Sequence, residues 1–235
     1  MITELTCANC GAAIDPASIR GDRAVCGYCG IAFRVPVSYT PEPDLGDLLL
    51  GADFRDPAVP GWIIAAPDNL EFRPGSPAEA WVNQPASDLI HAIIRTPGPF
   101  DDFDAGVNIR FISGVLDQVS AGLEVRSWDP GDYSIRISAQ GTFNIGWHDK
   151  TAWGDNLVPW STHPALRSNW GDANRLRVVM RGDRLRVYFN GVLAAALRDD
   201  RFPIGRVRVV LAPGKGGDAV VAFSDVQIRA APRQP

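Results

Sequence analysis

Two turn signals in the second half of the chain constrain its fold more than any other feature of the sequence. Gly182-Asp183 and Asn190-Gly191 are two-residue pairs of the kind that close β-hairpins, and alternating apolar and polar residues flank both. A hairpin closed at the first turn places three apolar pairs on one face: Met180 with Leu185, Val178 with Val187, and Leu176 with Phe189. A shift of one residue would mix the two faces, so the register is well determined. The stretch 175–197 is therefore predicted to be a three-stranded meander.

The opposite face of this meander is rich in arginine. The tripeptide Arg181-Gly182-Asp183 matches an adhesion motif, but here Gly182-Asp183 is expected to be the turn itself rather than a mobile loop. A nucleic-acid surface is not expected either, because the formal net charge is −4. These arginines are predicted to point away from the core, either into water or into the hollow of a curved sheet.

The same alternation recurs along most of the chain. In 107–111, 123–126 and 133–137, every second residue is apolar and the residues between them are polar. Gly (23 residues) and Pro (19 residues) are spread along the sequence, which fits many short strands joined by turns better than helices. From about residue 48 onward the sequence predicts an all-β fold of two packed antiparallel sheets.

All four cysteines lie near the N-terminus, at Cys7, Cys10, Cys26 and Cys29. Their C-x2-C-x15-C-x2-C spacing is typical of a structural Zn²⁺ site, in which four thiolates close the coordination sphere and leave no catalytic position. Two disulfides or a redox pair are the alternatives. The segment resembles the zinc-ribbon family. We expect a zinc ribbon over 1–36, which depends on its metal to fold, and a linker over 37–47.

The remaining sequence, 48–231, resembles the concanavalin A-like (laminin-G-like) jelly-roll domains. The phrases that carry the resemblance are "LLLGADFRDPAVPGW", "AGLEVRSWDPGDYSIRIS" and the final "VAFSDVQI". Within that group it is most similar to bacterial domains of the 3-keto-disaccharide hydrolase type. The resemblance implies an all-β, two-sheet antiparallel jelly-roll sandwich after the zinc module. In many relatives the concave sheet or its rim loops bind glycans.

Two groups of residues are candidates for contacting a ligand. Polar side chains of the predicted strands are expected to share one sheet surface, namely Asn108, Arg110, Glu124, Arg126, Ser134 and Arg136. Guanidinium groups beside one carboxylate suit sugars or an anionic ligand, although a solvated face of cross-strand ion pairs is the alternative. Trp153 and Trp160 lie in a long irregular segment, where they either stack on sugar rings or pin the loop to the sandwich.

Catalytic and calcium-binding motifs are weak in this sequence. Glu124 is the only glutamate in the middle of a strand beside a plausible cleft, and the paired acids of related jelly-roll glycosidases are absent. The acidic run 101–104 is a weak calcium candidate, because its spacing fits no defined calcium loop.

The sequence therefore predicts a non-catalytic binding protein that recognises a glycan or a protein partner, with the zinc ribbon as a docking unit. The alternatives are a carbohydrate-active enzyme that hydrolyses a sugar derivative, and a structural assembly subunit. Neither nucleic acid nor membrane is an expected partner, and the oligomeric state is open. The start "MITELTCANC" has no secretory pattern, which predicts a cytoplasmic protein.

Overall fold

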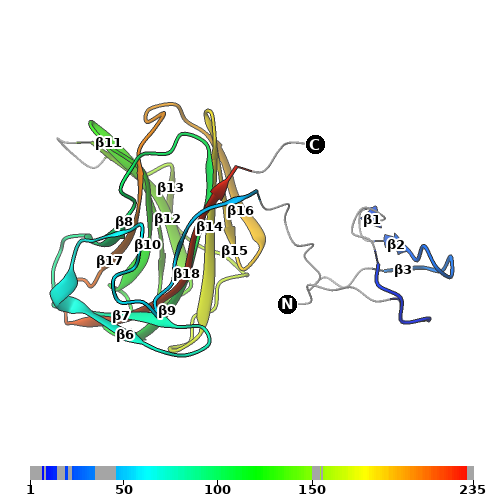
Figure 1. Ribbon diagram of the computed structural model, residues 1–235, viewed down its shortest axis with the longest axis horizontal. Coiled ribbons are helices and arrows are strands. Elements are labelled where there is room, and N and C mark those ends of the chain that lie inside the picture. The colour runs from blue at the N-terminus through cyan, green and yellow to red at the C-terminus, as the bar shows by residue number, and fades with distance from the viewer. Residues whose placement is uncertain are drawn as a thin grey trace. The chain divides into compact units, whose positions relative to one another are not determined.

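The computed structural model describes residues 7, 9–14, 19–20, 23–34, 46–149, 154 and 156–231. The chain divides into two compact units, Met1–Asp44 and Leu45–Pro235. Figure 1 shows the strands of both units. Among the described residues, no helix has the length and hydropathy needed to span a bilayer.

The small unit is a three-stranded antiparallel sheet. Its strands follow the order β1 (Ile19–Arg20), β2 (Arg23–Val25) and β3 (Ala32–Arg34). The buried apolar residues described here are Cys7, Ile14, Ala24 and Cys26. Two of these four described core residues are cysteines, so the cysteines contribute to the packing of this unit.

The large unit consists of two antiparallel sheets. The seven-stranded sheet has the order β13 (Val158–Thr162), β12 (Thr142–Asp149), β11 (Gly131–Ser138), β10 (Ser120–Ser127), β17 (Arg206–Ala212), β8 (His91–Arg95) and β5 (Ile63–Ile64). The eight-stranded sheet has the order β16 (Val192–Arg198), β15 (Arg184–Phe189), β14 (Ala173–Arg181), β9 (Phe103–Ser113), β18 (Ala219–Ala230), β7 (Glu79–Gln84) and β6 (Leu70–Arg73), with β4 (Leu48–Ala52) also paired to β18.

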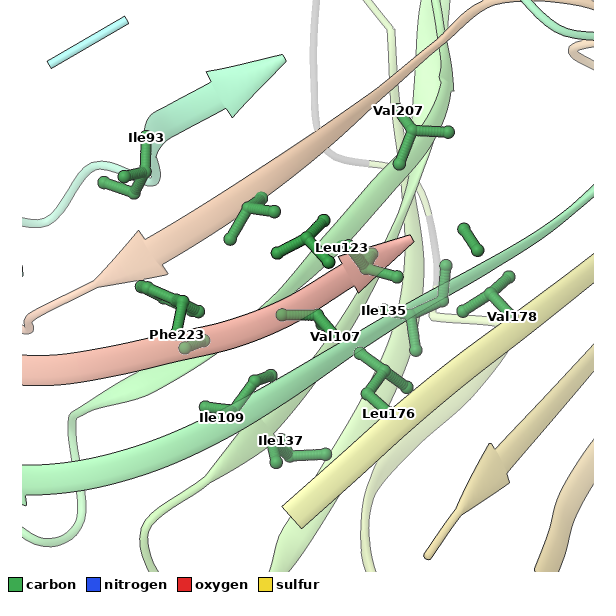
Figure 2. Close-up of a cluster of buried hydrophobic side chains, with 14 of the residues drawn as sticks. Ile93, Val107, Ile109, Leu123, Ile135, Ile137, Leu176, Val178, Val207 and Phe223 are labelled. Atoms are coloured by element: carbon green, nitrogen blue, oxygen red, sulfur yellow. The ribbon is translucent and has the colours of Figure 1, made fainter. Parts of the chain in front are cut away.

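The core lies between the two sheets. Figure 2 shows Val107 of β9, Val178 of β14 and Phe223 of β18 beside side chains of the opposite sheet, including Leu123 of β10 and Ile135 of β11. Each of these side chains is essentially inaccessible to water. Burying one Val, Leu, Ile or Phe side chain contributes about 1.5–3 kcal/mol, so this layer is the main source of stability. The predicted all-β, two-sheet sandwich is confirmed.

The predicted meander forms with the predicted register. β14 and β15 pair Met180 with Leu185 and Val178 with Val187, and Phe189 faces Leu176. Gly182, Asn190 and Gly191 all adopt positive φ, at 53°, 50° and 83°, as tight hairpin turns require. β16 then continues the meander, after a register shift at Val187/Tyr188.

Two outward arginines of this region pair with acids on the same face of the eight-stranded sheet. Arg177 on β14 donates through its Nε to Asp104 Oδ1 at 2.8 Å and through its Nη2 to Asp104 Oδ2 at 2.5 Å. Arg175 pairs with Asp225 at 2.9 Å. The Arg177 guanidinium also lies 5.0 Å from the Tyr188 ring centroid. This part of the face is an ion-paired surface of the eight-stranded sheet.

Removing the Arg177 guanidinium should lower the free energy of unfolding. The Arg177 and Asp104 side chains are only 10% and 3% exposed, so Arg177→Ala leaves a buried carboxylate without its hydrogen-bonded partner. We expect the free energy of unfolding in urea to fall by about 3–5 kcal/mol. The matched control is Arg198→Ala, since Arg198 and its partner Asp183 are 66% and 43% exposed. That variant should lose less than about 1 kcal/mol, and equal losses in both variants would contradict the prediction.

Candidate functional site

The four cysteine side chains converge in the small unit. Their sulfur atoms all lie within 4.8 Å of one another, with Cys7 Sγ 3.6 Å from Cys29 Sγ and Cys10 Sγ 3.7 Å from Cys26 Sγ. A disulfide would need about 2.05 Å. A tetrahedral ion with bonds of about 2.3 Å separates its sulfur ligands by about 3.8 Å, which is close to the observed spacing. The cluster can therefore hold a metal ion.

The backbone presents the cysteines in two matching turns. Gly11 N–H donates to Cys7 O, and Gly30 N–H donates to Cys26 O, both at 2.8 Å. Gly11 and Gly30 each have φ of 72°, a conformation that side chains other than glycine rarely adopt. In the second turn the backbone amide of Ile31, together with hydrogen bonds from the other cysteines, lowers the pKa of the Cys29 thiol to about 6. Although the Ala12 amide opposes it, the same coupling raises the pKa of Cys10, so Cys29 is the thiol that most readily becomes the thiolate that a metal requires.

In the large unit, a second cluster lies on the side of the seven-stranded sheet that faces away from the core, and four of its six members are buried. We call it the polar face, and its residues are Glu124, Asp132, Ser134, Arg136, Asn144 and Arg208. These side chains alternate with core residues such as Leu123 and Ile135, so they point away from the core. The strand register places Arg208, Glu124 and Ser134 in one row across β17, β10 and β11. Arg136 and Asn144 are neighbours in the next row, on β11 and β12.

Arg208 forms ion pairs with two carboxylates at the centre of this face. Arg208 Nη2 lies 2.9 Å from Glu124 Oε2 and 2.5 Å from Asp132 Oδ2. Burial raises the pKa of the Glu124 carboxyl to about 7, and the Asp132 charge adds to the rise although Arg208 opposes it. Burial also raises the pKa of Asp132. Arg208 and Arg136 both favour the charged form of Glu124, but they do not offset burial and the Asp132 charge, so the Glu124 carboxyl holds its proton up to near-neutral pH.

Several buried atoms of the polar face lack hydrogen-bond partners. Within the described part of the chain, Asp132 Oδ1, Ser134 Oγ and Arg208 Nε are buried and make no hydrogen bond. Each such group costs about 1–3 kcal/mol. Native structures keep few of them, and those they keep often mark sites that a water or a ligand completes.

Two tryptophans flank the polar face. Trp128 and Trp160 are each 45% exposed. The Arg206 guanidinium carbon lies 4.2 Å from the Trp128 ring centroid, and that of Arg136 lies 5.5 Å from Trp160. A pocket of about 500 Å³ adjoins Trp128, and Asp132, His148, Arg206 and Arg208 are among its other lining residues. The volume is within the range of small-ligand sites.

The residues that the sequence predicts to contact a ligand lie on both sheets. Glu124, Ser134 and Arg136 share the polar face, with Trp160 beside them on β13. Asn108 and Arg110 lie on β9 of the other sheet, where Arg110 pairs with Glu79. The core therefore separates them from Glu124, and the expectation of one common surface is wrong for these two residues. Trp153 lies outside the described residues.

Arg126 also departs from the expected surface. Its side chain is only 1% exposed, and it donates to the carbonyl oxygens of Asp101 and Phe202. Its φ of 51° and the register shift between Glu124 and Ser127 mark a β-bulge that turns the side chain inward. Arg126 therefore ties strand β10 to two loops and is absent from the polar face.

The sequence interpretation omitted Asp132 and Arg208 from the site. Asp132 alternates with Ser134 and Arg136, so its face could have been predicted. Arg208 also alternates with valines in "RVRVV", but no local signal pairs β17 with β10.

The acidic run considered for calcium is engaged in other contacts. Asp104 binds Arg177, and Asp102 Oδ1 accepts from Gly182 N–H at 2.7 Å. Among the residues that the structure describes, the cysteines form the only group of three or more side chains of metal-ligating type.

Comparisons with known proteins support the fold. The chain matches no protein-family model and no curated protein. Its structure is similar to the carbohydrate-binding module CBM66 from Bacillus subtilis, with TM-score 0.55 and 17% identity over 72% of this chain and 96% of that one. It is also similar to a glycoside hydrolase family 16 endo-glucanase from Bacteroides ovatus, with TM-score 0.60 and 10% identity over 77% of this chain and 100% of that one.

A third similar structure is the receptor-binding domain of botulinum neurotoxin type G. The TM-score is 0.56 at 12% identity, over 80% of this chain and 49% of that one, so the match spans about half of the neurotoxin domain. The large unit therefore has the jelly-roll sandwich fold of carbohydrate-binding modules and family 16 glycoside hydrolases.

The raised pKa of Glu124 predicts a pH-dependent stability. Between its ordinary value of 4.5 and about 7, the folded protein holds more protons than the unfolded chain, so the free energy of unfolding falls as pH rises through this window. The fall should reach up to about 3 kcal/mol for this group, and Glu124→Gln should remove that contribution. Denaturant titrations at several pH values measure it.

The matched control is Asp88→Asn. Asp88 is a 61% exposed carboxylate paired with Lys215, and this pairing lowers its pKa, so its removal should leave the slope in this window unchanged. Identical slopes for the wild type and Glu124→Gln would contradict the prediction.

Proposed function

We propose that the large unit is a non-catalytic binding domain that recognises a glycan through the polar face. The observation that carries the proposal is the combination of buried, unpartnered polar atoms with two half-exposed tryptophans on the same sheet surface. Sugar rings present apolar C–H faces that stack on indoles and hydroxyl groups that satisfy polar atoms.

The comparisons favour the same class of ligand. One similar structure is a carbohydrate-binding module and another is a receptor-binding domain, which keeps a protein partner as the alternative. The resemblance of 48–231 to 3-keto-disaccharide hydrolase-type domains also favours a sugar derivative.

A carbohydrate-active enzyme is the second candidate, because Glu124 and Asp132 lie close together. Both contact the same Arg208 nitrogen, at 2.9 Å and 2.5 Å, so the two contacting oxygens are no farther apart than the carboxyl groups of retaining glycosidases, which are about 5–5.5 Å apart. A Glu124 pKa of about 7 would suit a general acid. However, Arg208 contacts both carboxylates, and Glu124, the candidate general acid, is 6% exposed and is not among the residues that line the pocket beside Trp128, so binding is the favoured function.

We propose that the small unit is a zinc ribbon that serves as a docking unit. The support is the sulfur spacing, which fits Zn²⁺, and the matched turns that present the thiols. Reduced thiolates of this kind are typical of the cytoplasm, where we place the protein.

A glycan array probed with the full chain tests the binding proposal. We expect binding to at least one class of glycan, without release of new reducing ends. Trp160→Ala should weaken that binding about tenfold by removing an aromatic platform. Trp170→Ala is the matched control, because Trp170 is 42% exposed and not part of the polar face. No bound glycan with an intact fold would sink the proposal, and released reducing ends would favour the enzyme.

Metal analysis tests the zinc ribbon. The wild-type chain should carry one zinc ion, measured by mass spectrometry of the metal content. Cys26→Ser should lose most of it, because a neutral hydroxyl replaces a thiolate ligand. Tyr28→Ser changes an 85% exposed neighbour in the same turn and should retain the zinc. Full zinc content in Cys26→Ser, or four titratable thiols and no metal in the wild type, would be incompatible with the proposal.

A further inference from the structure

The residues that line the pocket beside Trp128 indicate which class of sugar the polar face binds. It lies where the turn between β10 and β11 meets strand β17, and its lining includes Trp128, Asp129, Asp132, Arg206 and Arg208. The pocket thus joins an exposed aromatic ring to the central carboxylate–guanidinium cluster.

The charges that line the pocket are balanced. It has two carboxylates, Asp129 and Asp132, and two guanidinium groups, Arg206 and Arg208, together with the imidazole of His148. Arg208 is already engaged by Asp132 and Glu124. An anionic ligand would compete with both carboxylates for Arg208, and a cation would meet the arginines. Electrostatic complementarity therefore favours an uncharged ligand.

The unpartnered atoms point to the same conclusion. Asp132 Oδ1 can only accept a hydrogen bond when the carboxyl is ionised, and Arg208 Nε can only donate one. A carboxylate, sulfate or phosphate group could satisfy the donor but would be repelled by the acceptor. A hydroxyl group satisfies both, because it donates and accepts. These two atoms lie beneath the surface, so a hydroxyl reaches them through a bridging water or by displacing one.

The Trp128 ring supplies the apolar part of the site. It is 45% exposed, and Arg206 lies against it at 4.2 Å from the ring centroid to the guanidinium carbon. Stacking of a sugar ring on this indole would place the ring hydroxyls next to the Asp132–Arg208 pair.

Resting on the proposed glycan-binding function, we infer that the pocket selects a neutral sugar ring with free hydroxyl groups and rejects the corresponding acidic sugar. Asp132 determines this selectivity by presenting an acceptor for a hydroxyl and a repulsive charge for a carboxylate. Arg208 provides the donor, and Trp128 the platform.

Matched oligosaccharides that differ only in charge test this inference. We would titrate the full chain by calorimetry with oligomers of galactose and galacturonate, of mannose and mannuronate, and of glucose and glucuronate. At least one neutral oligomer should bind at least tenfold more tightly than its acidic counterpart. Raising the NaCl concentration should change the affinity of the protein for that neutral oligomer less than twofold, since binding neutralises no net charge.

Variants assign the selectivity to named residues. Asp132→Asn should reduce the ratio of the affinities for the neutral and the acidic oligomer at least tenfold. Trp128→Ala should lower the affinities for both members of a pair by about the same factor. Arg186→Gln, on the outer face of the other sheet, should change neither affinity. Thermal unfolding checks that each variant folds. Trp128 is half-exposed, so its variant keeps the test available if Asp132→Asn destabilises the protein.

The outcomes separate the two proposals. Preferential binding of an acidic oligomer, with affinity that falls steeply with salt, would overturn the inference but keep the glycan-binding function. An unchanged ratio of the affinities for neutral and acidic oligomers in a folded Asp132→Asn variant would also overturn the inference. Absence of binding to every neutral and acidic oligomer, in this set and on the array, would overturn the proposed function itself.

Discussion

The apolar layer between the two sheets is the constraint on which the rest of the structure depends. Because side chains alternate along a strand, each strand that buries one face must present the other face outward. Both outer surfaces of the sandwich therefore carry polar side chains. The two surfaces differ in how their charged side chains are paired. On the eight-stranded sheet, buried and half-buried arginines meet carboxylates of their own, as Arg177 meets Asp104 and Arg110 meets Glu79.

The centre of the seven-stranded sheet differs in how its charges are paired rather than in their number. Glu124 and Asp132 share Arg208, and further atoms of the polar face stay without partners among the described residues. A polar network in a low-dielectric setting stabilises a fold only when every member is satisfied. The polar face therefore contributes less to stability than its counterpart, and a bound hydroxyl-rich ligand would complete it. This contrast, rather than the presence of arginines as such, separates a structural surface from a candidate binding surface.

Local patterns predicted much of this fold. The meander register followed from two turns and three apolar pairs, and Glu124, Ser134 and Arg136 were correctly placed on one face because alternation is a local property. The grouping of Arg110 with them failed because a strand's sheet depends on distant pairing: β9 lies between β14 and β18 rather than beside β10. The role of Arg208 was missed for the same reason, since β17 reaches β10 only through the tertiary fold.

Arg126 shows how one exception to alternation shapes the site. Strict alternation would place it on the polar face beside Glu124, as the sequence analysis expected. Instead the bulge and the left-handed backbone turn its guanidinium inward, where backbone carbonyls of Asp101 and Phe202 accept its hydrogen bonds. Those bonds offset the cost of burying the charge and hold the end of β10, from which Trp128 and the turn to Asp132 continue. A residue that lies outside the pocket thus joins the end of β10 to two loops, next to the turn that carries Trp128 and Asp132.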